Sequence, residues 1–344
     1  MARFAVWRAI RRRKRADACL WLAAPPGVRE IRAFSGQMAL GTGRVASPPL
    51  RSAIMQRMKL TVSRTQSVEE FLATAVAFLA EREAEHNLIF GICSTVQKSP
   101  EIFEEPPRFA VVTDGRGRVR AASVQTPPFN VVLSMIDAEA ATDALADALR
   151  DDPLPGVLGP KEAAARFAKR WGAATGRQAT REVAERIFRL ERVTQPRRRA
   201  TGTWRIADER DRGVIARWAV AFRNEVDPRS PPISDPDALA GRWIEQVGRI
   251  GYVWEDGGEV VSLVGAGGDT PNGIRIGPVY TPPEKRGRGY ASSLTAAASE
   301  DQLGRGRRFV FLFTDLSNPT SNKIYRAIGY RPVVDVDQYR FTDA

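Results

Sequence analysis

A basic, glycine-rich turn near the C-terminus has the residue types of a phosphate-binding site. Residues 280–291 have the sequence YTPPEKRGRGYA and follow an apolar run at 274–279 that predicts a strand. The Ala- and Leu-rich residues 292–302 predict a helix directly after the turn. Glycine lets backbone N–H groups approach an anion, and a helix N-terminus offers unpaired donors and partial positive charge. Arg286 and Arg288 would add charge-assisted hydrogen bonds, so we expect a ligand that carries phosphate.

The spacing of the glycines excludes two common phosphate-binding motifs. A dinucleotide fingerprint needs G-x-G-x-x-G early in a βαβ unit, whereas the run Gly287-x-Gly289-x-x-Ser292 lies in the last fifth of the chain. The chain also has no P-loop G-K-[ST] sequence. The pattern that is present is R-x-x-G-x-A, formed by Arg286, Gly289 and Ala291.

A second motif follows about 30 residues later. Residues 309–313 predict a strand, and the next segment is Asn318-Pro-x-x-x-Asn322-x-x-Tyr325 before a Gly-Tyr pair. It predicts a short helix that carries an Asn and a Tyr. The two motifs in this order resemble the GNAT N-acetyltransferase superfamily, in which the first motif is the coenzyme A pyrophosphate loop. The resemblance covers roughly residues 203–344.

This resemblance implies a fold and a set of ligands. The fold is mixed α/β, with a mostly antiparallel central sheet flanked by helices. Strands four and five splay apart, and coenzyme A enters the gap. The co-substrate is acetyl-CoA, the acceptor is a small-molecule or peptide amine, and no metal is implied. The implied cofactor-binding residues are Val279, Tyr280, Thr281, Arg286, Gly287, Arg288, Gly289, Tyr290, Ala291, Asn318 and Asn322.

The implied chemistry is direct attack of a primary amine on the thioester. The resemblance makes Tyr325 the general acid for the thiolate, because an unperturbed phenol titrates near ~10 and holds its proton at neutral pH. Asn318 before Pro319 is first of all a helix N-cap with proline at N1. The general base stays open between Glu225, Asp227 and a relayed water. Gly277-Pro278 either breaks the pairing that the splay requires or is an edge-strand proline.

The first half of the chain predicts a similar order of elements without the phosphate loop. The predicted strands are 59–63, 109–113, 119–124, 131–135 and 186–193, and the predicted helices start near Val68 and span 138–150 and 161–174. The sequence after the fourth strand is Ile136-Asp-Ala-Glu139, and two carboxylates would repel a pyrophosphate. We therefore expect a tandem protein, with a degenerate GNAT-like domain at 59–195, a linker at 196–202 and an acetyltransferase domain at 203–344.

The second half predicts the complete order. Its predicted strands are 203–206, 251–254, 260–265, 274–281 and 309–313, its predicted helices include one face around Ile215 and the segment 241–248, and residues 227–236 form a loop. In both halves the hairpin turns at an Asp-Gly pair, Asp114-Gly115 and Asp256-Gly257.

The positive charge of the chain lies in its first 57 residues. The 344 residues include 52 basic and 40 acidic side chains; residues 1–57 hold 12 and two of them, which leaves 40 and 38 in the rest. The rest is nearly neutral and has no basic-aromatic pattern, which argues against nucleic acid. For residues 1–57 we expect a disordered basic extension or a mis-assigned start before Met58, with a basic tail and a targeting signal as the alternatives.

The remaining chemistry-bearing residues give weaker predictions. The two cysteines, Cys19 and Cys93, form no metal spacing or disulfide framework, so a reducing, cytoplasmic setting is expected. No apolar run reaches the ~18 residues of a membrane span. We expect Cys93 in the core, and His86 as a cationic cap or surface residue at a helix end.

The sequence thus predicts an acetyl-CoA-dependent N-acetyltransferase that acts on an amine. The alternative is a non-catalytic acyl-CoA-binding or regulatory module, which the presence of Tyr325 disfavours.

Overall fold

The computed structural model describes residues 59–343, which form two successive runs with the same order of strands and α-helices. Predictions for residues 1–57 lie outside the described residues. The first run is β1 (Thr61–Thr65), α2 (Val68–Glu81), α3 (Asn87–Lys98), η2 (Pro100–Ile102), β2 (Arg108–Thr113), β3 (Val119–Gln125), β4 (Val131–Leu133), α4 (Glu139–Ala148), β5 (Gly156–Pro160), α5 (Lys161–Thr175) and β6 (Gln178–Leu190).

The second run repeats this order from residue 203 onward. It comprises β7 (Thr203–Ile206), η3 (Glu209–Asp211), α6 (Arg212–Val226), α7 (Pro236–Ile244), β8 (Arg249–Asp256), β9 (Glu259–Gly267), β10 (Gly273–Tyr280), η4 (Pro283–Lys285), α8 (Tyr290–Gly304), β11 (Phe309–Asp315), α9 (Pro319–Ala327) and β12 (Arg331–Thr342).

All the strands of residues 59–343 belong to one sheet, and its order exchanges the last strand of each run. The 12-stranded order is β1-β2-β3-β4-β5-β12-β6-β11-β10-β9-β8-β7. Only β4–β5 and β10–β11 pair in parallel; the other neighbours are antiparallel. Strand β6 pairs with β11 of the second run, and β12 pairs with β5 of the first. The expected mixed α/β fold with a largely antiparallel sheet is confirmed.

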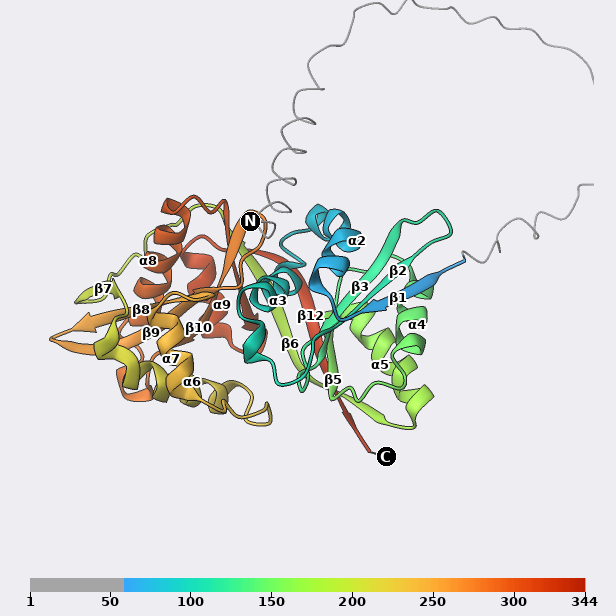
Figure 1. The fold of residues 1–344 in the computed structure, drawn as a ribbon. Helices are drawn as coiled ribbons and strands as arrows, with labels where there is room; N and C mark the ends of the chain where they lie inside the picture. Colours follow the sequence, from blue (N-terminus) through green and yellow to red (C-terminus); the bar gives the residue numbers. More distant parts are fainter. Residues whose placement is uncertain (1–58, 344) are drawn as a thin grey trace, which may run out of the picture. The chain divides into compact units, whose positions relative to one another are not determined.

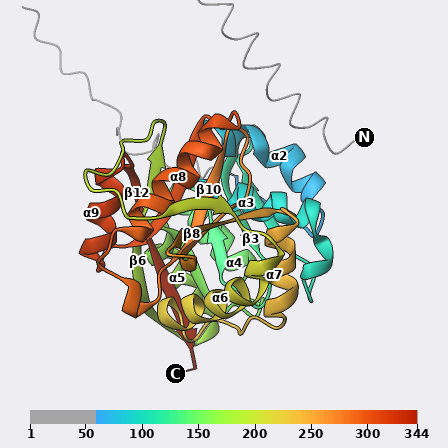
Figure 2. The same cartoon turned by 90° about the vertical axis from the view of Figure 1, so that its left-hand side faces the viewer.

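In the second run, helices cover both faces of the sheet. Successive side chains of a strand point to opposite faces, so apolar side chains on each face can pack against helices. Helix α8 packs on the face that carries Val264, Ile274 and Val310. Helices α6 and α7 pack on the opposite face, where Trp243 meets Leu263 in a second core. Figures 1 and 2 show α8 and the α6–α7 pair on either side of β8, β9 and β10. Any ligand between β10 and β11 would therefore reach both faces.

Most predicted elements are confirmed, with local differences that have physical causes. Helix α7 begins at Pro236, inside the predicted loop, because the Asp235 side chain accepts a hydrogen bond from Ala238 N and proline fits the first turn. Strand β6 begins at Gln178, before the predicted residue 186, because β12 pairs with it along its whole length. The elements α3, β5 and β12 were not among the predicted ones.

The prediction for His86 is wrong, whereas that for Cys93 is confirmed. Cys93 is fully buried in α3. His86 is also buried, and it makes no side-chain cap at the start of α3. Its Nδ1 hydrogen-bonds the Leu79 carbonyl oxygen at 2.8 Å, and Nε2 accepts from Met135 N at 2.9 Å. Burial lowers the pKa of His86 to about 4, so the side chain is neutral rather than cationic. Within residues 59–343, no helix is long and apolar enough to cross a membrane.

Candidate active site

Strands β10 and β11 separate partway along their length. Their parallel pairing runs from Gly273 opposite Phe309 to Arg275 opposite Phe311, although both strands continue further. On its other edge, β10 stays paired with β9, with a register shift between Ile276 and Val279. The shift encloses Gly277, whose φ of +146° favours glycine, and Pro278, which has no N–H to donate. The expected splay is confirmed, and Gly277-Pro278 lies at the irregularity.

The turn after β10 leads into a helix N-terminus that no side chain caps. Gly287 and Gly289 have φ values of +79° and +86°, and Gly289 is the N-cap residue of α8. A Cβ at Gly289 would meet nothing closer than the Arg198 carbonyl oxygen at 3.9 Å. The first turn of α8 contains no acidic residue. The first N–H groups of this helix therefore keep their capacity to bind an anion.

Arg286 holds this turn to neighbouring elements. Its Nε donates to the Thr281 carbonyl oxygen at 2.8 Å, and its Nη2 donates to Glu225 Oε2 at the end of α6 at 2.7 Å. The Glu225 carboxylate raises the pKa of Arg286. Arg286 and Arg288 are both exposed as residues. Arg286 therefore positions the turn through contacts within the protein, and Glu225, a candidate base, already has a cationic partner.

The linker ahead of β7 packs against the same helix N-terminus, a contact that its basic composition did not predict. Ala200 N donates to Ser293 Oγ in the first turn of α8 at 3.1 Å. Thr201 Oγ1 and the hydroxyl of Tyr290 both donate to Asp256 Oδ2. These hydrogen bonds, Tyr290's first, lower the pKa of Asp256. Tyr290 is thus an anchor whose ring is buried in the core.

The end of β10 is fixed by contacts with strand β9 and helix α6. Ser262 Oγ donates to the Tyr280 carbonyl oxygen at 3.1 Å and lies 2.9 Å from Thr281 Oγ1. The Tyr280 ring lies 5.7 Å from that of Trp218 on α6. Val279 pairs with Val264 of β9. Val279, Tyr280 and Thr281 therefore have defined backbone positions beside the splay.

Helix α9 brings the two asparagines and Tyr325 of the second motif to the end of β11. Asn318 Oδ1 accepts from Ser321 N at 3.0 Å with Pro319 at N1, which confirms the predicted N-cap. Asn322 Nδ2 donates to the carbonyl oxygens of Asp315 and Asn318, both at 2.8 Å. Its Oδ1 is one of the buried polar atoms without a partner in the described part of the chain. Asn322 can therefore still accept a hydrogen bond from a ligand.

Tyr325 is partly buried against the core beneath α8. Its ring lies 6.0 Å from the Tyr330 ring in an edge-on arrangement. Burial raises the pKa of Tyr325 to about 12, and among residues 59–343 its hydroxyl has no hydrogen-bond partner. The phenol therefore holds its proton at neutral pH and is available as a donor.

The corresponding turn of the first run is occupied by ion pairs. Helix α4 follows β4 as α8 follows β10, and its N-cap residue is Ala138. Asp137 pairs with Arg82 at 3.0 Å, and Glu139 in the first turn of α4 pairs with Arg166 at 2.6 Å. The carboxylates thus lie where an anion would bind, as expected from the sequence.

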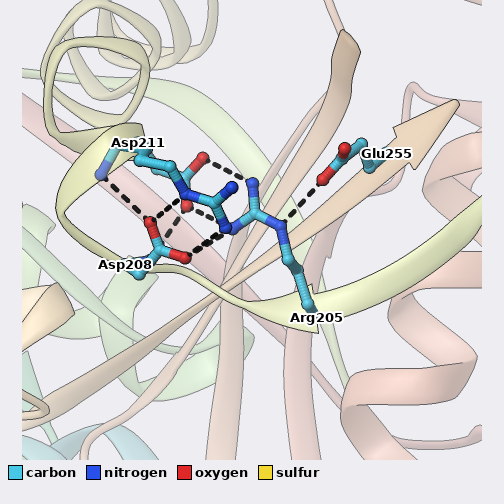
Figure 3. Close-up of polar contacts among 5 residues, drawn as sticks. Arg205, Asp208, Asp211 and Glu255 are labelled. Atoms are coloured by element: carbon cyan, nitrogen blue, oxygen red, sulfur yellow. Dashed lines mark hydrogen bonds and ion pairs between the residues drawn. The ribbon is translucent and has the colours of Figure 1, made fainter. Parts of the chain in front are cut away.

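The start of helix α6 is held by an arginine of the preceding strand β7. Figure 3 shows Arg205 of β7 between Asp208, Asp211 and Glu255. Its Nη1 donates to Asp211 Oδ2 at 2.6 Å, and its Nε donates to Glu255 Oε2 at 2.8 Å. The Asp211 side chain is only 2% exposed. The cluster therefore joins β7, β8 and the turn before α6.

Comparison with known proteins agrees with this geometry. Residues 204–330 match the model of the acetyltransferase (GNAT) family. No curated protein sequence matches the chain. Among solved structures, a Drosophila protein aligns at a TM-score of 0.58 and 14% identity, covering 83% of this chain and 99% of its own. A tandem GNAT protein from the clavulanic acid biosynthesis pathway aligns at 0.51 and 14% identity, covering 83% and 98%.

These two similarities show the fold of the described chain, and the family model shows the domain in its second half. Residues 204–330 therefore match the GNAT acetyltransferase family model, and the described chain has a fold similar to that of a tandem GNAT protein.

Proposed function

We propose that this protein is an acetyl-CoA-dependent N-acetyltransferase that transfers the acetyl group to a primary amine by direct attack. The observation that carries the proposal is the uncapped N-terminus of α8 beside the splayed strands β10 and β11. A helix N-terminus binds phosphate, and unpaired strand edges bind an extended amide chain. Coenzyme A contains both groups.

The residues present fit such a ligand. A Cβ at Gly289 would make only ordinary van der Waals contacts, and this uncrowded turn and the first turn of α8 suit the pyrophosphate, together with Gly287, Arg288, Tyr290 N and Ala291 N. Arg286 acts indirectly, because its hydrogen bond to the Thr281 carbonyl oxygen maintains the shape of the turn. The backbone of Val279, Tyr280 and Thr281 lies along the pantetheine path, and the buried Asn322 Oδ1 has no partner in the described chain. When bound, acetyl-CoA supplies the acyl group.

The chain's own residues then serve the transfer. Tyr325 gives a proton to the leaving thiolate, because its raised pKa keeps the phenol protonated. Asn318 and Asn322 fix the start of α9 and thereby the position of Tyr325.

The difference between the N-termini of α4 and α8 also supports a division into domains. We propose that residues 59–195 form a degenerate GNAT-like domain without a coenzyme A site, joined by the linker 196–202 to the acetyltransferase domain at 203–344. The ion pairs of Asp137 and Glu139 support this division. The exchange of β6 and β12 links the two domains through the sheet. A cytoplasmic location stays a prediction.

Thiol release from acetyl-CoA in the presence of a panel of primary amines tests the proposal. We expect release that depends on the amine and equals the acetylated amine measured by mass spectrometry. Acetyl-CoA binding without amine-dependent release would contradict catalysis and establish the non-catalytic acyl-CoA-binding module instead.

A further inference from the structure

Two arginines on the sheet have guanidinium nitrogens without partners. Nη1 of Arg249 and Nη1 of Arg275 are buried, and neither has a hydrogen-bond partner in the described chain. Each guanidinium lies over an aromatic ring instead, Arg249 at 5.2 Å from the Trp243 ring and Arg275 at 5.9 Å from the Phe313 ring. A buried guanidinium group without a hydrogen-bonded anion is unfavourable, so these side chains are expected to serve a negatively charged partner.

The two arginines lie on one face of the sheet. Both are paired in register with Gly267 of the intervening strand β9. A Cβ at Gly267 would lie 3.1 Å from Arg249 Cβ, and one at Gly265 would lie 3.1 Å from Arg249 Cδ. Glycines on β9 therefore leave room for the arginine side chains. This is the face that α6 and α7 cover, opposite α8.

Arg205, also in the second half, is an example of a guanidinium group that has its hydrogen-bond partners within the protein. Arg205 has carboxylate partners on three sides (Figure 3). Its pKa is raised, chiefly by the hydrogen bonds to Asp211. Burial instead lowers the pKa of Arg249 to about 9 and that of Arg275 to about 10, and each still carries its charge at neutral pH.

A carboxylate lies on the same face where β10 and β11 separate. Arg275 is the last β10 residue that pairs with β11, and Glu185 of β6 is paired with Asp315 at the far end of β11. Burial first, and then the Asp315 carboxylate, raise the pKa of Glu185 to about 7 against the opposing effect of Arg275. Within residues 59–343 the Glu185 carboxylate accepts no hydrogen bond.

We infer that this face binds the acetyl acceptor, and that the acceptor is an amine bearing a carboxylate. The carboxylate would accept hydrogen bonds from Nη1 of Arg249 and of Arg275, and the ammonium group would lie at Glu185. Two guanidinium groups and the carboxylates of Glu185 and Asp315 are complementary to a zwitterion. A dianion such as phosphate would face repulsion from the two carboxylates. The inference rests on the proposed function and specifies its substrate class.

The proton balance of the transfer gives Glu185 a role as base. The substrate ammonium gives one proton to Glu185, and the amine lone pair forms the bond to the acetyl carbon. The bond from that carbon to sulfur breaks, and the thiolate takes the proton of Tyr325. The amide nitrogen loses its second proton to solvent, from which Tyr325 is reprotonated. Glu185 releases its proton to solvent, so one proton is released per turnover.

The first experiment compares Arg249→Met and Arg275→Met with the wild type. A panel of α- and ω-amino acids is assayed by thiol release, each beside its primary carboxamide. Loss of one charge-assisted hydrogen bond should raise KM for the acids about 10- to 100-fold, with little change for the amides. Because the ratio of variant to wild type is taken for each compound, differences in amine pKa cancel. Arg308→Met is the matched control, since Arg308 is exposed but also lies over a ring, that of Phe309 at 5.0 Å.

The second experiment tests the base through pH. Wild-type kcat/KM should rise as Glu185 loses its proton near pH 7. Glu185→Gln should lower kcat and remove this rise with the same amine, and Asp315→Asn should move it to lower pH. An unchanged profile in Glu185→Gln overturns the role of the carboxylate.

The outcomes separate the inference from the proposed function. Equal use of acids and amides, with acetyl-CoA binding intact, overturns the inference and leaves the acetyltransferase assignment standing. Failure to bind acetyl-CoA overturns the assignment. A thermal-shift measurement without acetyl-CoA then tests the carboxylate-binding site by itself. Amino acids, but not their amides, should raise the melting temperature of the wild type and leave that of Arg275→Met unchanged. No difference between the two would overturn the inference.

Discussion

The single histidine of this chain should make folding sensitive to mild acid. The hydrogen bonds of His86 fix one neutral tautomer, with Nδ1–H donating to the Leu79 carbonyl oxygen and Nε2 accepting from Met135 N. A proton on Nε2 would face the Met135 N–H group and remove that acceptor. The folded protein therefore resists protonation of His86, whereas the unfolded chain does not.

The size and sign of the effect follow from the two pKa values. Burial lowers the pKa of His86 from 6.5 in the unfolded chain to about 4, and Arg82 lowers it as well, against the opposing effects of the Leu79 hydrogen bond and Asp137. The unfolded state binds the proton first as pH falls, so stability is full above 6.5 and is lost between 6.5 and 4. Between pH 7 and pH 5 the loss should be about 2 kcal/mol.

Glu185 opposes this slope in the wild type. Its folded pKa of about 7 lies above the value of 4.5, so its contribution to stability is present at low pH and is lost as pH rises through 7. Between pH 5 and pH 7 the effects of Glu185 and His86 on stability therefore have opposite signs. We therefore expect a shallow pH dependence in wild type and the full loss of about 2 kcal/mol in Glu185→Gln.

Urea unfolding at pH 5, 6 and 7 checks this expectation. The variants are Glu185→Gln and the double variant Glu185→Gln/His86→Leu, and the free energy of unfolding is compared as a slope against pH because His86→Leu also costs stability at every pH. The double variant should have no loss between pH 7 and pH 5. A loss as steep as in Glu185→Gln would refute the reasoning, since it would place the titrating group elsewhere.

Three further predictions concern the site and its scaffold. Tyr325→Phe should lower kcat roughly 100-fold with acetyl-CoA affinity kept; unaltered turnover in steady-state kinetics would reduce Tyr325 to a packing residue. Titration calorimetry should give one acetyl-CoA per chain, and a stoichiometry of two would show that the first half also binds. Arg205→Met should cost about 3–5 kcal/mol in urea unfolding because it leaves the buried Asp211 carboxylate without its cation. Arg210→Met, whose side chain is 75% exposed, should cost far less. Similar losses in the two variants would contradict the role of the cluster.

Features set by local chemistry were predictable from the sequence. The glycine-rich turn, the Asn318 N-cap and the hairpin turns depend on residues a few positions apart, so their patterns are visible in the chain. The splay was predicted from the family resemblance, with Gly277-Pro278 as its local sign.

Features set by distant pairing were not predictable. The exchange of β6 and β12 depends on which strand edges meet, and nothing in either strand's own pattern specifies that partner. His86 resembled a helix-end cation because the sequence does not show that Leu79 and Met135 enclose it. Arg275 lies in an otherwise apolar strand, and that single interruption was the one local signal for the cluster on this face.

Binding of acetyl-CoA to Gly289→Glu, measured by calorimetry, tests the central claim most directly. A glutamate there places a side chain and a negative charge at the N-terminus of α8. Gly117→Glu is the matched control, because Gly117 also has a positive φ, +75°, and open surroundings, but lies in the first half. Both variants should unfold at similar temperatures. We predict that Gly289→Glu loses acetyl-CoA binding while Gly117→Glu keeps it; undiminished binding by a folded Gly289→Glu would contradict the site.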